Sequence, residues 1–240
     1  MITSPQNPFF KKLKSLLKAK GIKKEKLCLI HGDKIIREVL KAPLSFSHYV
    51  YSPPLDSHHL RPLLEKEGIK PFFISHSLFK ELDPLNTQCP LLVCHIPLIE
   101  KINLPLSPPQ GLEVLCALGD PANLGALFRC AEAFSVNKVF LFAESAFPLL
   151  PKVIKSSSGS VFRTPFAFLP SIQDFKEDPY TWALDLHGTP LPEWSPPPHL
   201  RLLVGEEGPG LPSGLKVPRL YIPIKKTVES LNAVSAVSIA

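Results

Sequence analysis

The 240-residue chain lacks the long hydrophobic run that a membrane-spanning helix requires. No stretch approaches ~18 consecutive uncharged apolar residues. Lysines interrupt every apolar run between Phe9 and Leu27, which argues against a secretory signal segment. Hydrophobic residues make up 45% of the chain and charged residues 20%, so the composition is not that of a disordered protein. We therefore expect a globular cytoplasmic protein that makes no contact with membranes.

Cysteine is scarce and lacks the spacing that would give it a structural role. The chain has five cysteines, an odd number, and no Cys-x-x-Cys pair. Cys28 and Cys94 lie in apolar runs, as small buried thiols do. This favours reduced cysteines over a disulfide framework. The adjacent pairs Cys94–His95 and His58–His59 have no partner at metal-ligand spacing, so no metal site is expected.

The signatures of three common enzyme classes are also missing. The stretch GEEGPG (205–210) is not the Gly-x-Gly-x-x-Gly turn of dinucleotide-binding proteins, and no Walker A sequence is present. The Gly-x-Ser-x-Gly turn of serine hydrolases is absent as well. If the protein is an enzyme, its site must be built from other residues.

Proline, in contrast, is abundant. The 28 prolines amount to about twice the usual frequency of ~5% and show no Gly-X-Y period, which excludes a collagen-like chain. The stretch LPLSPPQG (104–111) combines adjacent prolines with Ser and Gly and is typical of a stiff connection. We therefore predict a domain at 1–103, a linker at 104–111 and a second domain at 112–240.

The net charge of +6 is concentrated at the N-terminus. Residues 1–26 contain eight lysines and one acid, so the rest of the chain sums to only −1. Apolar residues at helical spacing between these lysines predict a basic amphipathic helix that ends near Gly21. Such a helix is either a solvated surface or a contact for nucleic-acid phosphates. In the second case, Lys11, Lys12 and Lys14 are the candidate RNA-binding residues.

Short predicted strands alternate with predicted helices in both halves of the chain, which indicates the α/β class. In the first half we expect strands at 27–30, 48–51, 71–74 and 91–94, and helices at 33–40 and 57–67. In the second half we expect strands at 112–120, 138–143, 182–186, 201–205 and 220–224, and helices at 124–133 and from 230 to the C-terminus.

Polar residues gather in three segments that follow predicted strands. They are GDPANLGALFRCAEAF (119–134), VGEEGPGLP (204–212) and IPIKKTVESLNAVSA (222–236). Ligands of open parallel α/β sheets bind beyond the carboxyl ends of the strands, so these segments are candidates for a site. Each also has an ordinary interpretation, because Asn123 and Ser230 could cap helices and the glycines could form tight turns.

Taken together and in this order, the three segments resemble the motifs of the SpoU family of RNA ribose 2′-O-methyltransferases, in the SPOUT superfamily. The resembling stretches are DPANLGALFRCAEAF, LLVGEEGPGLP and YIPIKKTVESLNAVSAVSIA, with a weaker match at KSSSGSVFRTP (155–165). The resemblance covers about residues 110–240. The first half is similar, more loosely, to the small ribosomal-protein-like α/β domain that often precedes this family's catalytic domain and binds the substrate.

The resemblance implies a mainly parallel α/β sheet with helices on both faces, tied into a deep trefoil knot. It also implies S-adenosylmethionine as cofactor, RNA as partner, no metal, and a homodimer with its active sites near the interface. The residues that it places in the cofactor pocket are Gly205, Ile222 and Leu231. Those that it places in the polar catalytic cluster are Asn123, Arg129, Glu207, Ser230 and Asn232.

These residue types suit the chemistry that the resemblance implies. A ribose 2′-hydroxyl is a poor nucleophile and must lose a proton as it attacks the methyl group. Because arginine is a poor base, Arg129 would act together with the RNA phosphate or stabilise the developing alkoxide. Asn123 and Glu207 would orient it, and catalysis would otherwise consist of aligning two bound reactants.

The sequence departs from the family pattern at several positions. Ser135 stands where relatives usually carry glycine, and the third motif has Lys225 and Lys226 where a glycine is usual. These two lysines are further candidates for RNA contact. They also keep open a non-catalytic RNA-binding or ribosome-assembly protein, and a different small-molecule enzyme on the same sheet is a third possibility. The separate N-terminal domain favours ribosomal RNA over transfer RNA as the substrate.

Overall fold

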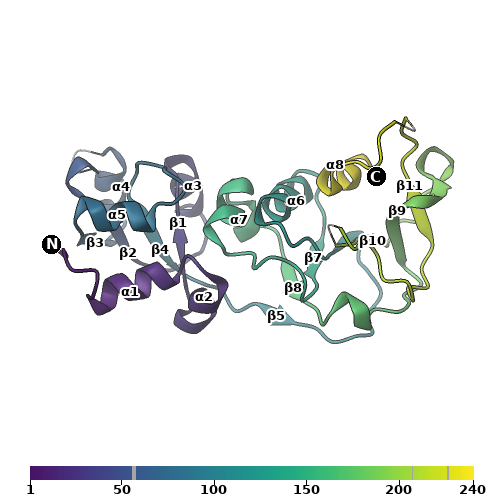
Figure 1. Cartoon of the computed structure of the whole chain (residues 1–240), viewed down its shortest axis with the longest axis horizontal. Helices are drawn as coiled ribbons and strands as arrows, with labels where there is room; N and C mark the ends of the chain where they lie inside the picture. The colour runs from purple at the N-terminus through teal and green to yellow at the C-terminus, as the bar shows by residue number, and fades with distance from the viewer. Residues whose placement is uncertain (56–57, 207, 226) are drawn as a thin grey trace. The chain divides into compact units, whose positions relative to one another are not determined.

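The protein is described by a computed structural model over residues 1–55, 58–206, 208–225 and 227–240 (Figure 1). The chain forms two compact units. The first unit consists of Met1–Leu98 and Phe147–Phe162, and the second of Ile99–Ala146 and Arg163–Ala240. The chain therefore leaves the second unit once, contributes a short segment to the first, and returns.

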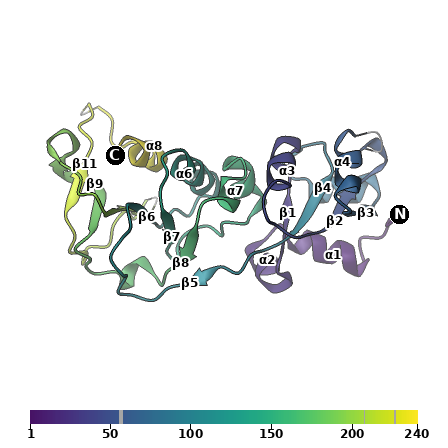
Figure 2. The same cartoon turned by 180° about the vertical axis from the view of Figure 1, so that it is seen from behind.

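The first unit contains a four-stranded sheet in the order β1-β4-β2-β3 (Figure 2). Its strands are β1 (Leu27–Ile30), β4 (Leu91–His95), β2 (Phe46–Tyr51) and β3 (Lys70–Phe73). Strand β4 is antiparallel to β1 and β2, while β2 and β3 are parallel. The helices of this unit are α1 (Pro8–Ser15), α2 (Ala19–Glu25), α3 (Asp33–Val39), η1 (Pro53–Leu55), α4 (Leu60–Lys66), α5 (His76–Leu82), α7 (Pro151–Ser156) and η2 (Ser160–Phe162).

The basic N-terminal segment forms two helices rather than the one expected. Asn7 caps α1, with its side-chain oxygen accepting hydrogen bonds from the backbone nitrogens of Phe9 at 2.9 Å and Phe10 at 3.2 Å. Gly21 does not end the segment but lies inside α2. A Cβ atom at Gly21 would lie 2.0 Å from the carbonyl oxygen of Ser15, so the close approach of the two helices requires glycine.

The five cysteines are free, as predicted. Cys28 and Cys94 lie opposite each other in the β1–β4 ladder, and both are fully buried. The hydrogen bond with Cys94, together with burial, raises the pKa of the Cys28 thiol well above its ordinary value. The Cys28 thiol therefore stays protonated, and both cysteines act as small core residues.

The second unit contains a seven-stranded sheet in the order β11-β9-β10-β6-β7-β8-β5. All of its neighbouring strands are parallel, which confirms the predicted α/β fold. The strands are β5 (Glu100–Lys101), β6 (Leu112–Cys116), β7 (Lys138–Leu141), β8 (Phe166–Phe168), β9 (Thr181–Pro190), β10 (Leu200–Val204) and β11 (Arg219–Tyr221). The helices are α6 (Pro121–Ala133), η3 (Ile172–Asp174), η4 (Leu191–Glu193) and α8 (Ala233–Ile239).

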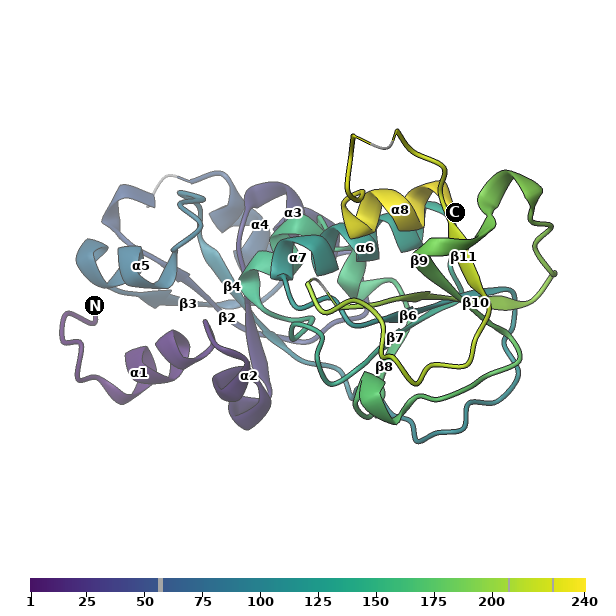
Figure 3. The same cartoon turned by 45° about the vertical axis from the view of Figure 1, so that its right-hand side comes forward.

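The two faces of this sheet are covered differently. Helices α6 and α8 lie side by side over one face (Figure 3), where Leu112, Val114 and Leu202 point toward them. On the other face, a buried cluster joins the strands to η3 and to extended chain. The resemblance implies helices on both faces, but the second face carries a 3₁₀ helix and extended segments. The trefoil knot stays a prediction.

The proline-rich stretch at 104–111 is packed against the second unit rather than acting as a linker. Strand β5 pairs with β8, and Ile102, Leu104 and Leu106 pack on the buried cluster of the sheet. The second unit therefore begins at Ile99, before the expected boundary. Apolar residues between the prolines account for this, because burying them against the sheet outweighs the tendency of the prolines to form a solvated connection.

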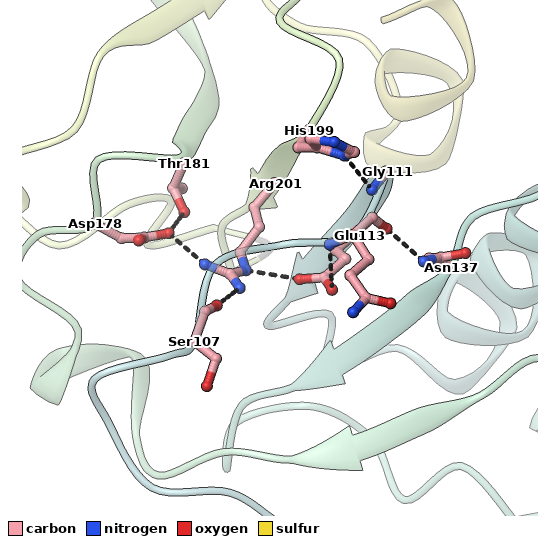
Figure 4. A network of polar contacts seen from close by, with 9 residues as sticks. Ser107, Gly111, Glu113, Asn137, Asp178, Thr181, His199 and Arg201 are labelled. Atoms are coloured by element: carbon pink, nitrogen blue, oxygen red, sulfur yellow. Dashed lines mark hydrogen bonds and ion pairs between the residues drawn. The ribbon is translucent and has the colours of Figure 1, made fainter.

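A buried charged network holds this stretch at the amino ends of β6 and β10 (Figure 4). Arg201 is 1% exposed, and its Nε donates to Glu113 at 2.8 Å. One terminal nitrogen of Arg201 donates to Asp178 at 2.9 Å, and the other to the carbonyl oxygen of Ser107. A buried arginine needs such partners, since an uncompensated charge in the core is very costly.

Candidate active site at the carboxyl edge of the second unit

The three polar segments leave the same edge of the second sheet. Strands β6, β9 and β10 are parallel neighbours, and β11 is parallel to β9, so their carboxyl ends meet. The first segment continues into α6, the second forms the loop after β10, and the third connects β11 to α8. The topology therefore places all three segments at the sheet edge where parallel α/β proteins bind ligands.

The first turn of α6 is fixed by a capping aspartate. The side-chain oxygen Oδ1 of Asp120 accepts hydrogen bonds from the backbone nitrogens of Ala122 at 2.7 Å and Asn123 at 2.9 Å. Pro121 follows as the first helical residue, a position where its missing N–H costs nothing. Asn123 is therefore not the cap that the ordinary interpretation suggested, because Asp120 holds that position.

Asn232 caps α8 and joins the two helix starts. Its Oδ1 accepts hydrogen bonds from the backbone nitrogens of Val234 at 2.9 Å and Ser235 at 3.4 Å. Its Nδ2 donates to Oδ1 of Asn123 at 3.2 Å, across 109 residues of sequence. The structure thus brings together two of the predicted catalytic residues. The cap of α8 is Asn232, whereas Ser230 lies exposed two residues before it.

Arg129 lies further along α6, six residues after Asn123, which corresponds to about 9 Å along the helix axis. Its side chain is exposed and forms no hydrogen bond or ion pair with any residue in the described ranges. The neighbouring acid on the helix, Glu132, is bound instead by Arg163. An arginine in this condition is suited to binding an external anion such as a phosphate.

The loop after β10 is closed by its own backbone. The nitrogens of Glu206 and Gly210 each donate to the carbonyl oxygen of the other at 3.0 Å. A Cβ atom on Gly205 would lie 2.7 Å from the carbonyl carbon and oxygen of Gly210, so glycine is required there. The predicted catalytic residue Glu207 lies outside the described residues. The close crossing at Gly205 agrees with a loop shaped to receive a ligand.

The segment after β11 leaves backbone groups available to a ligand. Residues 222–224 and 230–231 belong to no helix or strand, and none of their backbone groups bonds another described residue. Ile222 and Leu231 are half-buried, so each combines apolar contact surface with exposed main chain. These features fit a nucleoside-containing cofactor bound through backbone groups and apolar contacts, as the resemblance implies for S-adenosylmethionine.

The predicted RNA-binding lysines are found in different surroundings. In the first unit, Lys14 pairs with Glu81 at 2.5 Å and Lys12 with Glu25 at 3.4 Å, whereas Lys11 is exposed without an ion pair to a described residue. In the second unit, Lys225 is exposed within the loop after β11. Lys226 lies outside the described residues.

Sequence reasoning missed Glu144, which follows β7 at the same sheet edge. Its carboxylate accepts hydrogen bonds from the hydroxyl of Ser171 and, at 3.0 Å, from the backbone nitrogen of Ile172. Burial would raise the pKa of the Glu144 carboxyl, but these hydrogen bonds hold the pKa below its usual value. The contact joins the loop after β7 to the loop after β8. No local sequence motif indicates this contact, because the two loops are separated in sequence.

No metal site emerges at this edge or elsewhere in the part of the chain that the structure describes, where no three His, Cys, Asp or Glu residues gather closely enough to hold an ion. Within the same residues, no helix is long and apolar enough to cross a membrane.

Comparisons with known proteins agree with this geometry. The family model described as the SpoU rRNA Methylase family matches residues 113–240. The chain is similar to the ribosomal RNA small subunit methyltransferase G 2 of Syntrophobacter fumaroxidans, with 32% identity over all of this chain and 48% of that protein. The chain therefore spans about half the length of this relative.

Two further proteins are similar over nearly their whole length. The 23S rRNA (guanosine(2553)-2′-O)-methyltransferase RlmP of Bacillus subtilis is 30% identical over 99% of this chain and 96% of its own. The structure of the SpoU methyltransferase AviRb from Streptomyces viridochromogenes, in complex with the cofactor AdoMet, has the same fold. The two structures match over 98% of this chain and 95% of AviRb, with a TM-score of 0.83 and 20% sequence identity. This chain belongs to the SpoU rRNA methylase family.

Proposed function

We propose that this protein is an RNA methyltransferase that transfers a methyl group from S-adenosylmethionine to a ribose 2′-hydroxyl. One observation carries the proposal. The hydrogen bond between Asn123 and Asn232 joins the first and third family motifs at the carboxyl edge of the sheet, on the helix that presents the exposed Arg129. Family membership supports the same activity.

Each group of the site has a role in this reaction. The cofactor, when bound, supplies an electrophilic methyl group. The loop that begins at Gly205 and the main chain near Ile222 and Leu231 hold it and exclude water. Arg129 would bind the RNA phosphate beside the target ribose and stabilise the negative charge that develops on the 2′-oxygen, and this phosphate would accept the proton that the 2′-hydroxyl loses. Asn123, held by Asn232, keeps the first turn of α6 aligned with the third motif, so that the two reactants meet in line.

The substrate that we propose is ribosomal RNA. The similarity to RlmP of Bacillus subtilis, whose name states a 23S rRNA substrate, extends over both units of this chain. The basic α1–α2 segment would supply contacts to the phosphate backbone through Lys11 and its neighbours. Transfer RNA is the alternative substrate. Ribosomal RNA also agrees with the cytoplasmic location expected from the sequence.

We further propose that the protein is a homodimer formed through α6 and α8. A groove of about 360 Å³ lies between these helices and the sheet, lined by apolar residues of both. Phe134 at the end of α6 is 61% exposed, and Ile239 in α8 is 55% exposed. Large apolar side chains gathered around an apolar groove favour burial against another protein surface.

The decisive experiment measures methyl transfer from labelled S-adenosylmethionine to unmodified 16S and 23S ribosomal RNA transcripts and to transfer RNA. In Arg129→Ala the rate should fall by about 100-fold or more, since losing one group that stabilises developing charge commonly costs 10²–10³. Binding of S-adenosylmethionine, measured by calorimetry, should be retained. Lys138→Ala, at the amino end of β7, is the control and should keep full activity.

Two results would contradict the proposal. Unchanged activity in Arg129→Ala would remove the role given to this arginine. Salt-dependent RNA binding by the wild-type chain without any binding of S-adenosylmethionine would instead favour a non-catalytic RNA-binding protein.

A further inference from the structure

Glu132, the acidic residue close to Arg129 on α6, is bound by an arginine from outside the helix. Arg163 binds Glu132 with two nitrogens, Nε to Oε1 at 2.5 Å and Nη2 to Oε2 at 2.8 Å. The pair is half-exposed, with side-chain exposures of 35% and 36%. Such a bidentate contact uses both carboxylate oxygens and fixes the orientation of the carboxylate more firmly than a single hydrogen bond does.

Glu132 is well placed to neutralise Arg129. It is the only acidic residue among the thirteen of α6, and it lies three residues after Arg129. Side chains at this spacing lie on neighbouring positions of the helix surface, where arginine and glutamate readily pair. In the structure they do not, because Glu132 is turned to Arg163 and Arg129 contacts no other described residue through its charged group.

We propose that Arg163 is a positioning residue for Arg129, acting by holding Glu132 away from it. The inference rests on the proposed role of Arg129 in binding the RNA phosphate. With Glu132 engaged, the Arg129 guanidinium keeps its full charge for the phosphate, and the phosphate approaches a helix surface without an unbalanced carboxylate. Loss of Arg163 would damage the site twice, by giving Arg129 a competing partner and by adding a negative charge that repels RNA.

The test compares Arg163→Ala, Glu132→Gln and the double variant in the full chain. Methyl transfer to unmodified 16S and 23S ribosomal RNA transcripts should fall about 3- to 10-fold in Arg163→Ala, the loss expected from one competing surface ion pair plus repulsion. Glu132→Gln alone should stay near the wild-type rate. The double variant should recover to near that rate, because the competing carboxylate is gone. Arg163→Lys should be impaired less than Arg163→Ala, since it keeps one charged contact.

A second measurement separates this proposal from the activity itself. The dependence of binding on salt is measured with the same transcripts and no cofactor. In Arg163→Ala the slope of log K against log salt should fall by about 1, as it should in Arg129→Ala, and the double variant should regain it. If the wild type transfers no methyl group, the proposed activity fails while this slope still tests the positioning role.

Two outcomes would overturn the inference. If Arg163→Ala retains wild-type rate and salt slope, Glu132 does not compete for Arg129. If the double variant is as impaired as Arg163→Ala, Arg163 acts on the fold or on RNA directly, and thermal unfolding of both variants would distinguish those two explanations.

Discussion

Ser135 illustrates at the scale of one residue how a departure from the family pattern is tolerated. Helix α6 ends in a Schellman motif, in which the nitrogen of Val136 donates to the carbonyl of Ala131 at 2.8 Å and that of Ser135 to Glu132 at 3.2 Å. This motif requires a left-handed residue, and Ser135 has a φ of +56°. The family pattern to which the sequence was compared has glycine there, which fits this geometry, since glycine adopts the left-handed conformation without strain.

Ser135→Gly should therefore stabilise the protein. The left-handed conformation costs a non-glycine residue about 1–2 kcal/mol of strain. Glycine avoids this strain, but it loses more conformational entropy on folding, which offsets roughly 0.5–1 kcal/mol of the gain. The free energy of unfolding, measured in urea, should rise by about 0.5–1 kcal/mol. The control is Ala133→Gly, two residues earlier in the right-handed helix, which should lower it by about 1 kcal/mol. A decrease in both variants would refute the explanation.

At the scale of elements, the loop after β10 depends on a crossing that leaves no room for a side chain. Gly205 meets the backbone of Gly210, and the two arms are held by a pair of hydrogen bonds between Glu206 and Gly210. The sequence places glycines here, but several turns would satisfy that pattern. Glycine is needed at position 205 only when the loop is closed, because the atoms that a Cβ would overlap belong to Gly210 on the opposite side of the loop.

Gly205→Ala should open this loop and weaken cofactor binding. The added Cβ overlaps Gly210 at 2.7 Å, and relieving overpacking of this kind costs about 1–3 kcal/mol. Calorimetry should show affinity for S-adenosylmethionine reduced by roughly 10-fold or more. Gly214→Ala is the matched control, since a Cβ there meets no atom within 4 Å. Equal affinity in the two variants would show that the loop does not form the cofactor pocket.

At the scale of the whole molecule, the division of the chain follows packing rather than composition. Residues 104–111 read as a solvated connection, yet Leu104 and Leu106 pack on the buried cluster of the second sheet and Arg201 binds the carbonyl oxygen of Ser107. Residues 147–162 lie between two segments of the second unit in sequence, yet they belong to the first unit. Both assignments depend on contacts with partners distant in sequence, which local composition does not encode.

The proposed dimer also belongs to this scale. Phe134→Asp places a charge at the edge of the apolar groove, where pairing would bury it without a partner. Sedimentation should show a wild-type dimer and a folded Phe134→Asp monomer, because the exposed Phe134 contributes little to the core of one chain. Leu98→Asp, at a fully exposed position that is not part of the groove lining, should remain dimeric. A monomeric wild type, or a variant that still pairs, would exclude this interface.

The predicted elements show where local pattern suffices and where it does not. The strands at 27–30 and 91–94 and the helix at 124–133 have clear apolar periodicity, and the structure has β1, β4 and α6 there. The short β8 and α7 were missed, because three to six residues carry too little periodicity to be recognised. The third-motif strand is shorter than expected and ends at Tyr221, before Pro223. Proline lacks the N–H that would continue the ladder.

By itself the sequence determined the α/β class, the reduced cysteines and the three ordered polar segments, because these depend on residue types and short spacings. Only the tertiary structure decided that Asn123 meets Asn232, that Arg163 holds Glu132, and that Arg201 is buried rather than solvated. The physical reason is that parallel strands pair across long connections. Each such contact therefore joins residues that are far apart in sequence, and the local sequence around either residue does not indicate its partner.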